Sequence, residues 1–73
     1  MKTHYKYIQF SQYGQEWLCI NNKTLLLGHV VFVSKWREWE FCPEPDCGFS
    51  IDCVRDIADF LGQLNQETKA KKK

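Results

Sequence analysis

The sequence predicts an α+β domain, an antiparallel β-meander of three to four strands packed on one C-terminal amphipathic α-helix. The first half of the 73 residues is rich in β-branched and aromatic residues, interrupted by Gly and Asn turn signals. Residues 51–66 instead repeat apolar positions at helical spacing. A chain of this length has room for one domain, and strands followed by one helix pack with the helix on one sheet face.

The expected strands span residues 4–10, 16–20, 24–34 and 38–42. Residues 11–15, which include Gly14, form the first loop, and Asn21-Asn22 can adopt the positive φ angles of a tight hairpin turn. Gly28 lies inside the third strand, where glycine indicates a β-bulge or a close backbone approach. Pro43 is expected to end the fourth strand because proline has no N–H to donate.

The helix is expected to begin after Ser50, whose hydroxyl can cap the first turn, and to end near Gln66. Phe60 falls at the edge of its apolar stripe, where it could extend a contact surface or pack beneath the fourth strand. Residues 67–73, ETKAKKK, have no apolar anchor. We therefore expect a domain over residues 1–66 and a disordered lysine-rich tail. The predicted stripe consists of Ile51, Val54, Ile57, Ala58, Leu61 and Leu64.

Both faces of the expected sheet are apolar. The third strand has one set of alternating residues on each side. The first is Leu25, Leu27, Val31 and Val33, with His29 among them, and the second is Leu26, Val30 and Phe32. One helix covers only one face, so the other needs the domain's own loops, a strong curl of the sheet, a second copy or a foreign protein. We expect association with a partner and a homodimer.

Charge is unevenly distributed along the chain, although the formal net charge is only +1. Residues 1–37 carry five basic residues against Glu16, whereas residues 38–59 carry seven acidic residues against Arg55. Without the lysine tail the chain is net negative, which argues against a dedicated nucleic-acid binder. The basic N-terminal half, the tail and stacking aromatic rings keep a small nucleic-acid-binding protein as the alternative.

No motif predicts catalysis or a cofactor. The glycines form no phosphate loop, and no Cys–His pair is supported as a nucleophile and base. His29 is expected to be a satisfied or surface histidine, and the paired carboxylates are expected to be solvated. No apolar run reaches the roughly 18 residues of a membrane span, and the start MKTHYKYIQF is too polar for a signal peptide, so a cytoplasmic location is expected.

The cysteines leave two interpretations open. Cys42 and Cys47 form a C-x4-C pair with Cys53 nearby, and three or four thiolates could hold a structural zinc ion. Only one such pair exists, at the wide end of the usual spacing, so free thiols are the simpler interpretation and no metal ligand is assigned. A disulfide is disfavoured in a reducing compartment.

Two groups of residues are candidate partner contacts. The run KWREWEF combines tryptophan and arginine, which are enriched at interface hot spots, and its candidates are Trp36, Arg37 and Trp39. An acidic surface around the helix start and its outer side would attract a basic partner. This second group consists of Glu44, Asp46, Asp52, Asp56 and Asp59, with Phe60 at its edge.

Residues 22–65 resemble a pattern found in small phage and prophage accessory proteins of unknown function. In that pattern a strand with a central glycine leads to an aromatic strand ending in F-x-P, then to a Phe-Ser helix start and a terminal Leu-Asn. The resemblance implies a non-enzymatic protein in the host cytoplasm that binds and modulates or inhibits a host bacterial protein, including anti-defence roles. The matching residues are Gly28, Trp39, Phe41, Pro43, Phe49, Ser50, Leu64 and Asn65.

Overall fold

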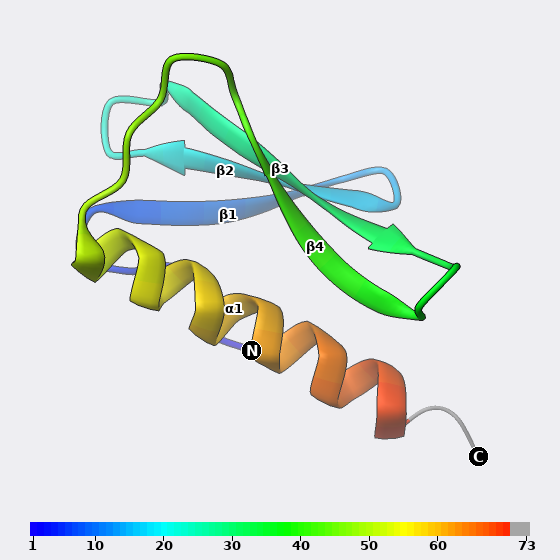
Figure 1. Ribbon diagram of the computed structural model, residues 1–73. Coiled ribbons are helices and arrows are strands. Elements are labelled where there is room, and N and C mark those ends of the chain that lie inside the picture. The colour runs from blue at the N-terminus through cyan, green and yellow to red at the C-terminus, as the bar shows by residue number, and fades with distance from the viewer. Residues whose placement is uncertain (71–73) are drawn as a thin grey trace.

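The computed structural model describes residues 1–70 and contains one four-stranded sheet followed by one helix (Figure 1). The elements are β1 (Ile8–Tyr13), β2 (Glu16–Asn21), β3 (Leu26–Val33), β4 (Glu38–Pro43) and α1 (Ile51–Ala70). Each strand pairs antiparallel with its neighbour in the chain. The predicted α+β meander is therefore confirmed, with four strands.

The first strand lies later in the chain than expected. The loop after it shrinks to Gly14 and Gln15, because Tyr13 pairs with Glu16. Gly14 has a φ of 62°, and a glycine at the first central position is the pattern of a type II′ hairpin turn. His4 and Tyr5, which were expected at the start of this strand, instead run with Thr3 along its free edge.

The turn between β2 and β3 uses its asparagines differently from the prediction. The Asn21 side-chain oxygen accepts hydrogen bonds from the backbone N–H groups of Lys23 and Leu25, at 2.8 and 2.9 Å. The residue with a positive φ is Thr24, at 62°, and not Asn22. Asn21 therefore shapes the turn through side-chain hydrogen bonding, which is the other way in which asparagine stabilises turns.

A β-bulge changes which residues of β3 share a face. Cys19 pairs with Gly28, but the next residue, Ile20, pairs with Leu26, so the register shifts between them. Leu26 therefore shares a face with Ile20, whereas Leu27 packs against the core. Simple alternation predicted the opposite faces for these two leucines, and the extra residue of the bulge is the reason.

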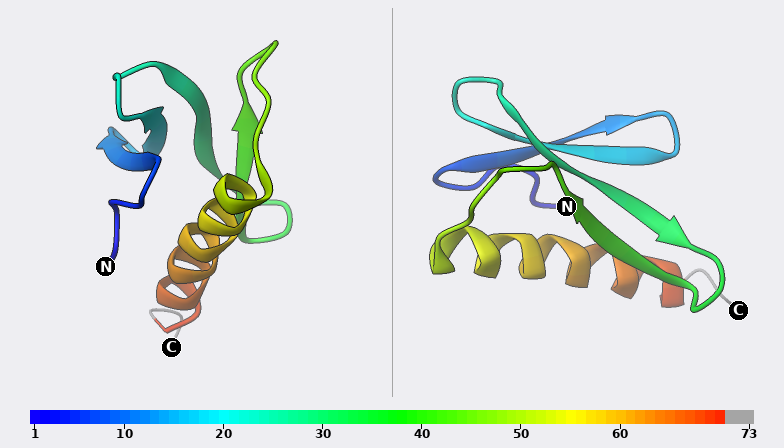
Figure 2. Two further views of the ribbon diagram at one scale, coloured as in Figure 1. Left: turned by 90° about the vertical axis from the view of Figure 1, so that its left-hand side faces the viewer. Right: turned by 45° about the horizontal axis from the view of Figure 1, so that its top comes forward.

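Helix α1 covers one face of the twisted sheet, which we call the inner face (Figures 1 and 2). Phe60 is fully buried there. Its ring stacks on Phe10, with centroids 3.9 Å apart, and meets the edge of Trp17 at 5.1 Å. The buried core consists of Ile8, Phe10, Cys19, Val30, Ile57, Phe60 and Leu64.

The buried stripe of α1 is rotated from the predicted one. Phe60 lies at its centre and is fully buried, so of the two roles left open for it the structure shows packing, against β1 and β2 and not beneath β4. Ile51 and Val54, which were predicted to be core residues, are 66% and 51% exposed. An aromatic ring buries more surface than either aliphatic side chain, and the helix turns to place that ring between β1 and β2.

The ends of α1 are held by side-chain hydrogen bonds. The Cys53 N–H donates to the Ser50 hydroxyl at 3.3 Å, as expected for the N-cap. The helix continues to Ala70, past the predicted end, and the Trp39 indole N–H donates to the Thr68 hydroxyl at 3.0 Å. Residues 67–70 are therefore helical and not part of a disordered tail, and residues 71–73 lie outside the described residues. Within residues 1–70, no helix combines the length and the apolar character that crossing a membrane would require.

Gly28 lies where two neighbouring strands approach too closely for a side chain. A Cβ atom added there would lie 2.6 Å from the Phe41 ring and 2.7 Å from the Cys42 carbonyl oxygen. The close approach predicted from the sequence is therefore confirmed. At Gly62, in α1, an added Cβ would meet nothing within 4 Å.

We expect Phe60→Ala to lower the free energy of unfolding by about 3–5 kcal/mol, because it opens a cavity between β1 and β2. Val54→Ala on the exposed side of α1 should cost less than about 1 kcal/mol. Urea denaturation followed by circular dichroism measures both. Equal losses in the two variants would contradict the rotated stripe.

We expect opposite effects from two Gly→Ala substitutions. Gly28→Ala should destabilise the fold by about 1–3 kcal/mol, because Phe41 and the β4 backbone must move. Gly62→Ala should stabilise it by about 0.5–1 kcal/mol through helix propensity. Thermal unfolding of the two variants tests this, and a neutral Gly28→Ala would show that the strands can separate freely.

Candidate functional site

The outer face of the sheet, turned away from α1, is the candidate functional site. In Figure 2 no element of residues 1–70 lies over it. Because Phe10, Cys19 and Val30 point into the core, the residues that alternate with them point outward. No pocket is present in the part of the chain that the structure describes, and the outer face is an open surface.

The centre of the outer face is apolar apart from His29, which lies opposite Leu18. Its side chains come from the two middle strands and are half-buried against one another. This apolar centre consists of Leu18, Ile20, Leu26, Val31 and Val33. It confirms the prediction that both sheet faces are apolar, and the chain's own described loops leave this one open.

Carboxylates border the apolar centre. On β4, Glu38 lies opposite Val33 and Glu40 lies opposite Val31, so both share the outer face. Glu44 follows β4 and extends the ladder, since its backbone N–H donates to the Leu27 carbonyl at 2.9 Å. Glu16, at the start of β2, lies on the other side of the centre. We call these four glutamates the acidic border.

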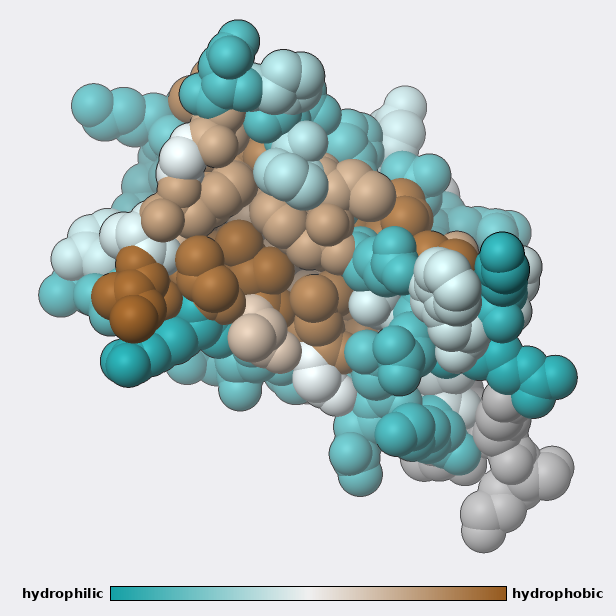
Figure 3. Space-filling model, in the orientation of Figure 1, coloured by the Kyte–Doolittle hydropathy of each residue, from teal (hydrophilic) through white to brown (hydrophobic). Residues whose placement is uncertain are grey.

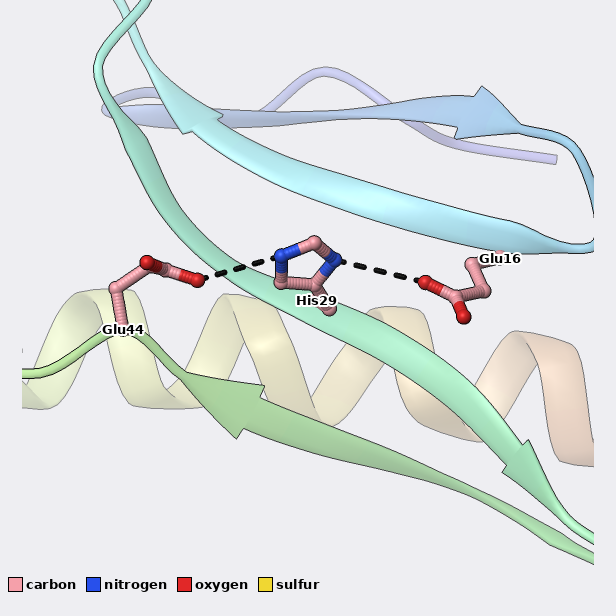
Figure 4. Close-up of polar contacts among 3 residues, drawn as sticks. All are labelled: Glu16, His29 and Glu44. Carbon is pink, nitrogen blue, oxygen red and sulfur yellow. Dashed lines mark ion pairs between the residues drawn. The ribbon is translucent and has the colours of Figure 1, made fainter.

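His29 links the two sides of the acidic border across β3 (Figure 4). Its Nδ1 atom lies 3.5 Å from a Glu16 oxygen, and its Nε2 atom lies 3.3 Å from a Glu44 oxygen. The imidazole side chain and both carboxylates are about 36–49% exposed, so these pairs remain in contact with water. Each ring nitrogen of His29 therefore has a carboxylate partner, as expected for a satisfied histidine. His29 is also the one basic residue that contacts these two glutamates.

The two groups of partner-binding residues predicted from the sequence do not form one surface. Trp36 is 56% exposed in the β3–β4 turn, where its indole N–H donates to the Glu40 carboxylate, and Arg37 follows it with a φ of 59°. Trp39 is half-buried on the inner face, where it meets Phe32 edge-on. Trp36 and Trp39 therefore lie on different sides of the sheet.

The predicted acidic group is also divided. Glu44 belongs to the outer face, whereas Asp46 lies in the loop before α1 and Asp52 is exposed in the first turn of the helix. Asp59 is turned toward the N-terminal segment and accepts a hydrogen bond from the Tyr5 hydroxyl at 2.7 Å. Asp56, a half-buried residue of the same helix, lies close enough to affect Tyr5 electrostatically.

The Tyr5 hydroxyl is part of the packing between the N-terminal segment and α1. It also accepts a hydrogen bond from the Gln63 amide at 2.9 Å. Burial, together with the hydrogen bond to Asp59 and the negative charge of that residue, holds the pKa of Tyr5 well above its usual range. The Asp59 carboxylate, one member of the predicted acidic group, therefore already has a hydrogen-bond partner within the fold.

A second hydrophobic area lies over the first half of α1 and the loop that leads into it (Figure 3). It includes the exposed Ile51 and Val54. The half-buried rings of Phe41 and Phe49 meet edge-on beside it, with centroids 5.5 Å apart. This area is on the inner side of the sheet and is separate from the outer face.

The four cysteines are free thiols, and Cys19 is buried while Cys42 is exposed. Among residues 1–70, no three His, Cys, Asp or Glu side chains are grouped so that they could hold a metal ion, and the zinc alternative therefore gains no support. Burial raises the pKa of the Cys19 thiol to about 12, and the neighbouring Cys53 adds to the shift. A thiol with such a pKa is scarcely ionised near neutral pH.

Sequence reasoning named Glu44 as a candidate contact but missed the other charged residues that the outer face brings together with it. Glu16 and His29 are far apart in the sequence, and the carboxylates of β4 were predicted only to be solvated. The signal that could have found them is the alternation Glu38-x-Glu40-x-Cys42-x-Glu44, which places all three glutamates on one side of a strand.

We expect iodoacetamide at about pH 8 to alkylate Cys42 readily and Cys19 only after unfolding, because the Cys19 thiol is buried and its pKa is raised. Peptide mass spectrometry of native and urea-treated protein measures the modification at each site. Alkylation of native Cys19 as fast as Cys42 would contradict the buried position.

No protein-family model, curated protein or solved structure matches this chain. The candidate site therefore depends on the geometry and chemistry of the outer face.

Proposed function

We propose that this chain is a non-enzymatic binding module that contacts another protein through its outer sheet face. In the setting implied by the sequence resemblance, that protein is a bacterial host protein whose activity the chain modulates or inhibits. The observation that supports the proposal is the apolar centre, formed by five aliphatic side chains with no element of residues 1–70 over them.

The physical reason is the incomplete burial of those side chains. Fully burying an aliphatic side chain contributes roughly 1.5–3 kcal/mol relative to leaving it exposed. The side chains of the apolar centre are half-buried, so covering the five of them adds several kcal/mol to association. Contiguous apolar surface on a small domain is typical of interaction sites.

We expect an outer-face variant, Leu18→Lys/Val31→Lys, to lose proteins that the wild-type chain captures from a bacterial lysate. Lysine puts two charges into the contact, while its aliphatic stem can still lie against the sheet. Val54→Lys, on the separate area over α1, should capture the same proteins as the wild type. Quantitative mass spectrometry of the captured fractions compares the three chains, and circular dichroism verifies that each is folded.

Two results would contradict this placement. Unchanged capture by the folded Leu18→Lys/Val31→Lys variant would exclude the outer face. Loss of capture in Val54→Lys alone would place the contact over α1 instead.

A further inference from the structure

We infer that the segment bound by the outer face is a basic amphipathic helix of the partner, with an apolar stripe flanked by Lys or Arg. This inference rests on the proposed function, since it specifies what covers that same face. The inference follows from the negative charge of the outer face, from the partial covering of both sheet edges and from the dimensions of the face.

The charge of the outer face is strongly one-sided. None of the residues in β1, β2, β3 or β4 is Lys or Arg. Among residues 1–70, the four glutamates form ion pairs only through His29, which contacts Glu16 and Glu44. One lysine lies at the margin, since the Lys35 ammonium group is over the ring of Trp36, which binds Glu40. A partner that fits this face therefore brings positive charge to its margins and apolar side chains to its centre.

A second copy of the chain does not meet this requirement. Stacking two outer faces would place one acidic border against the other while the centre lost its water. Like charges brought together at an interface cost several kcal/mol. The expected homodimer is therefore not the arrangement that this face favours.

Both edges of the sheet are partly closed to an added strand. On β1, the Phe10 N–H donates to the Thr3 carbonyl at 2.8 Å, so the N-terminal segment occupies that edge. On β4, the Trp39 N–H donates to the Asn65 side chain at 2.8 Å, and Pro43 has no N–H to offer. Such covered edges disfavour pairing with another strand, so contact through the face is preferred.

The dimensions of the face fit a helix. Four strands spaced by about 4.8 Å, each about 20 Å long, make a face of about 20 Å in each direction. The inner face of the same sheet is already covered by one helix, α1. A second helix on the outer face would complete a layered arrangement with the sheet in the middle.

The test uses the full chain and a fluorescently labelled helical peptide of about 18 residues, with leucines at helical spacing flanked by lysines. A matched peptide carries glutamate in place of every lysine. Fluorescence anisotropy should show binding of the lysine peptide, and at least about tenfold weaker binding of the glutamate peptide. Raising the salt from about 50 to about 300 mM should weaken the lysine peptide severalfold, because exposed charges are screened.

Variants of the chain show which of its residues bind the lysine peptide. Glu38→Gln/Glu40→Gln should weaken the lysine peptide about fivefold, because it removes two charges of the acidic border. Asp52→Asn/Glu67→Gln makes the same change in charge on exposed residues of α1 and should leave binding within about twofold. Leu18→Lys/Val31→Lys should abolish binding.

The outcomes separate this inference from the proposed function. Equal binding of both peptides, abolished by Leu18→Lys/Val31→Lys, would keep the outer face as a binding surface and overturn the basic partner. Absence of lysine-peptide binding up to about 1 mM would also overturn it, with the lysate experiment still deciding the proposed function. Lysine-peptide binding that survives Leu18→Lys/Val31→Lys would put the contact elsewhere and overturn both.

Discussion

Phe60 stacks on Phe10 and meets the edge of Trp17, and this contact decides how the helix and the sheet fit together. The ring joins α1 to the first two strands, and the hydrogen bonds from Trp39 join the helix to the last strand. Together they fix the rotation and the direction of α1 over the sheet. The exposure of Val54 follows, because a helix that buries Phe60 cannot also bury Val54 on its other side.

The same arrangement leaves the outer face open while it partly covers both sheet edges. The N-terminal segment lies along β1, and Asn65 of α1 binds the backbone of β4. A small sheet with free edges is prone to pair with other chains, and these contacts restrain that pairing. What the chain still offers is a face of side chains, and selectivity at a face depends on the chemistry of those side chains.

That chemistry combines two requirements that usually conflict. An apolar surface supplies binding energy but promotes aggregation, whereas charged residues keep a surface hydrated. Here the acidic border lies along β4 and at the start of β2, beside the apolar side chains of β2 and β3, and His29 contacts Glu16 and Glu44 across β3. The carboxylates keep the free chain hydrated and also select for a partner of opposite charge, so one group of residues serves both needs.

The sequence by itself determined the fold class, the helix start at Ser50 and the close approach at Gly28. Each depends on local spacing or on one residue's conformational limits. Only the tertiary structure decided that Phe60 is core while Ile51 is exposed, that Leu26 and Leu27 exchange faces, and that Glu16 and His29 meet. These depend on the rotation of the helix and the register of neighbouring strands. Both are set by contacts between residues distant in the chain, which a periodic pattern along one segment does not specify.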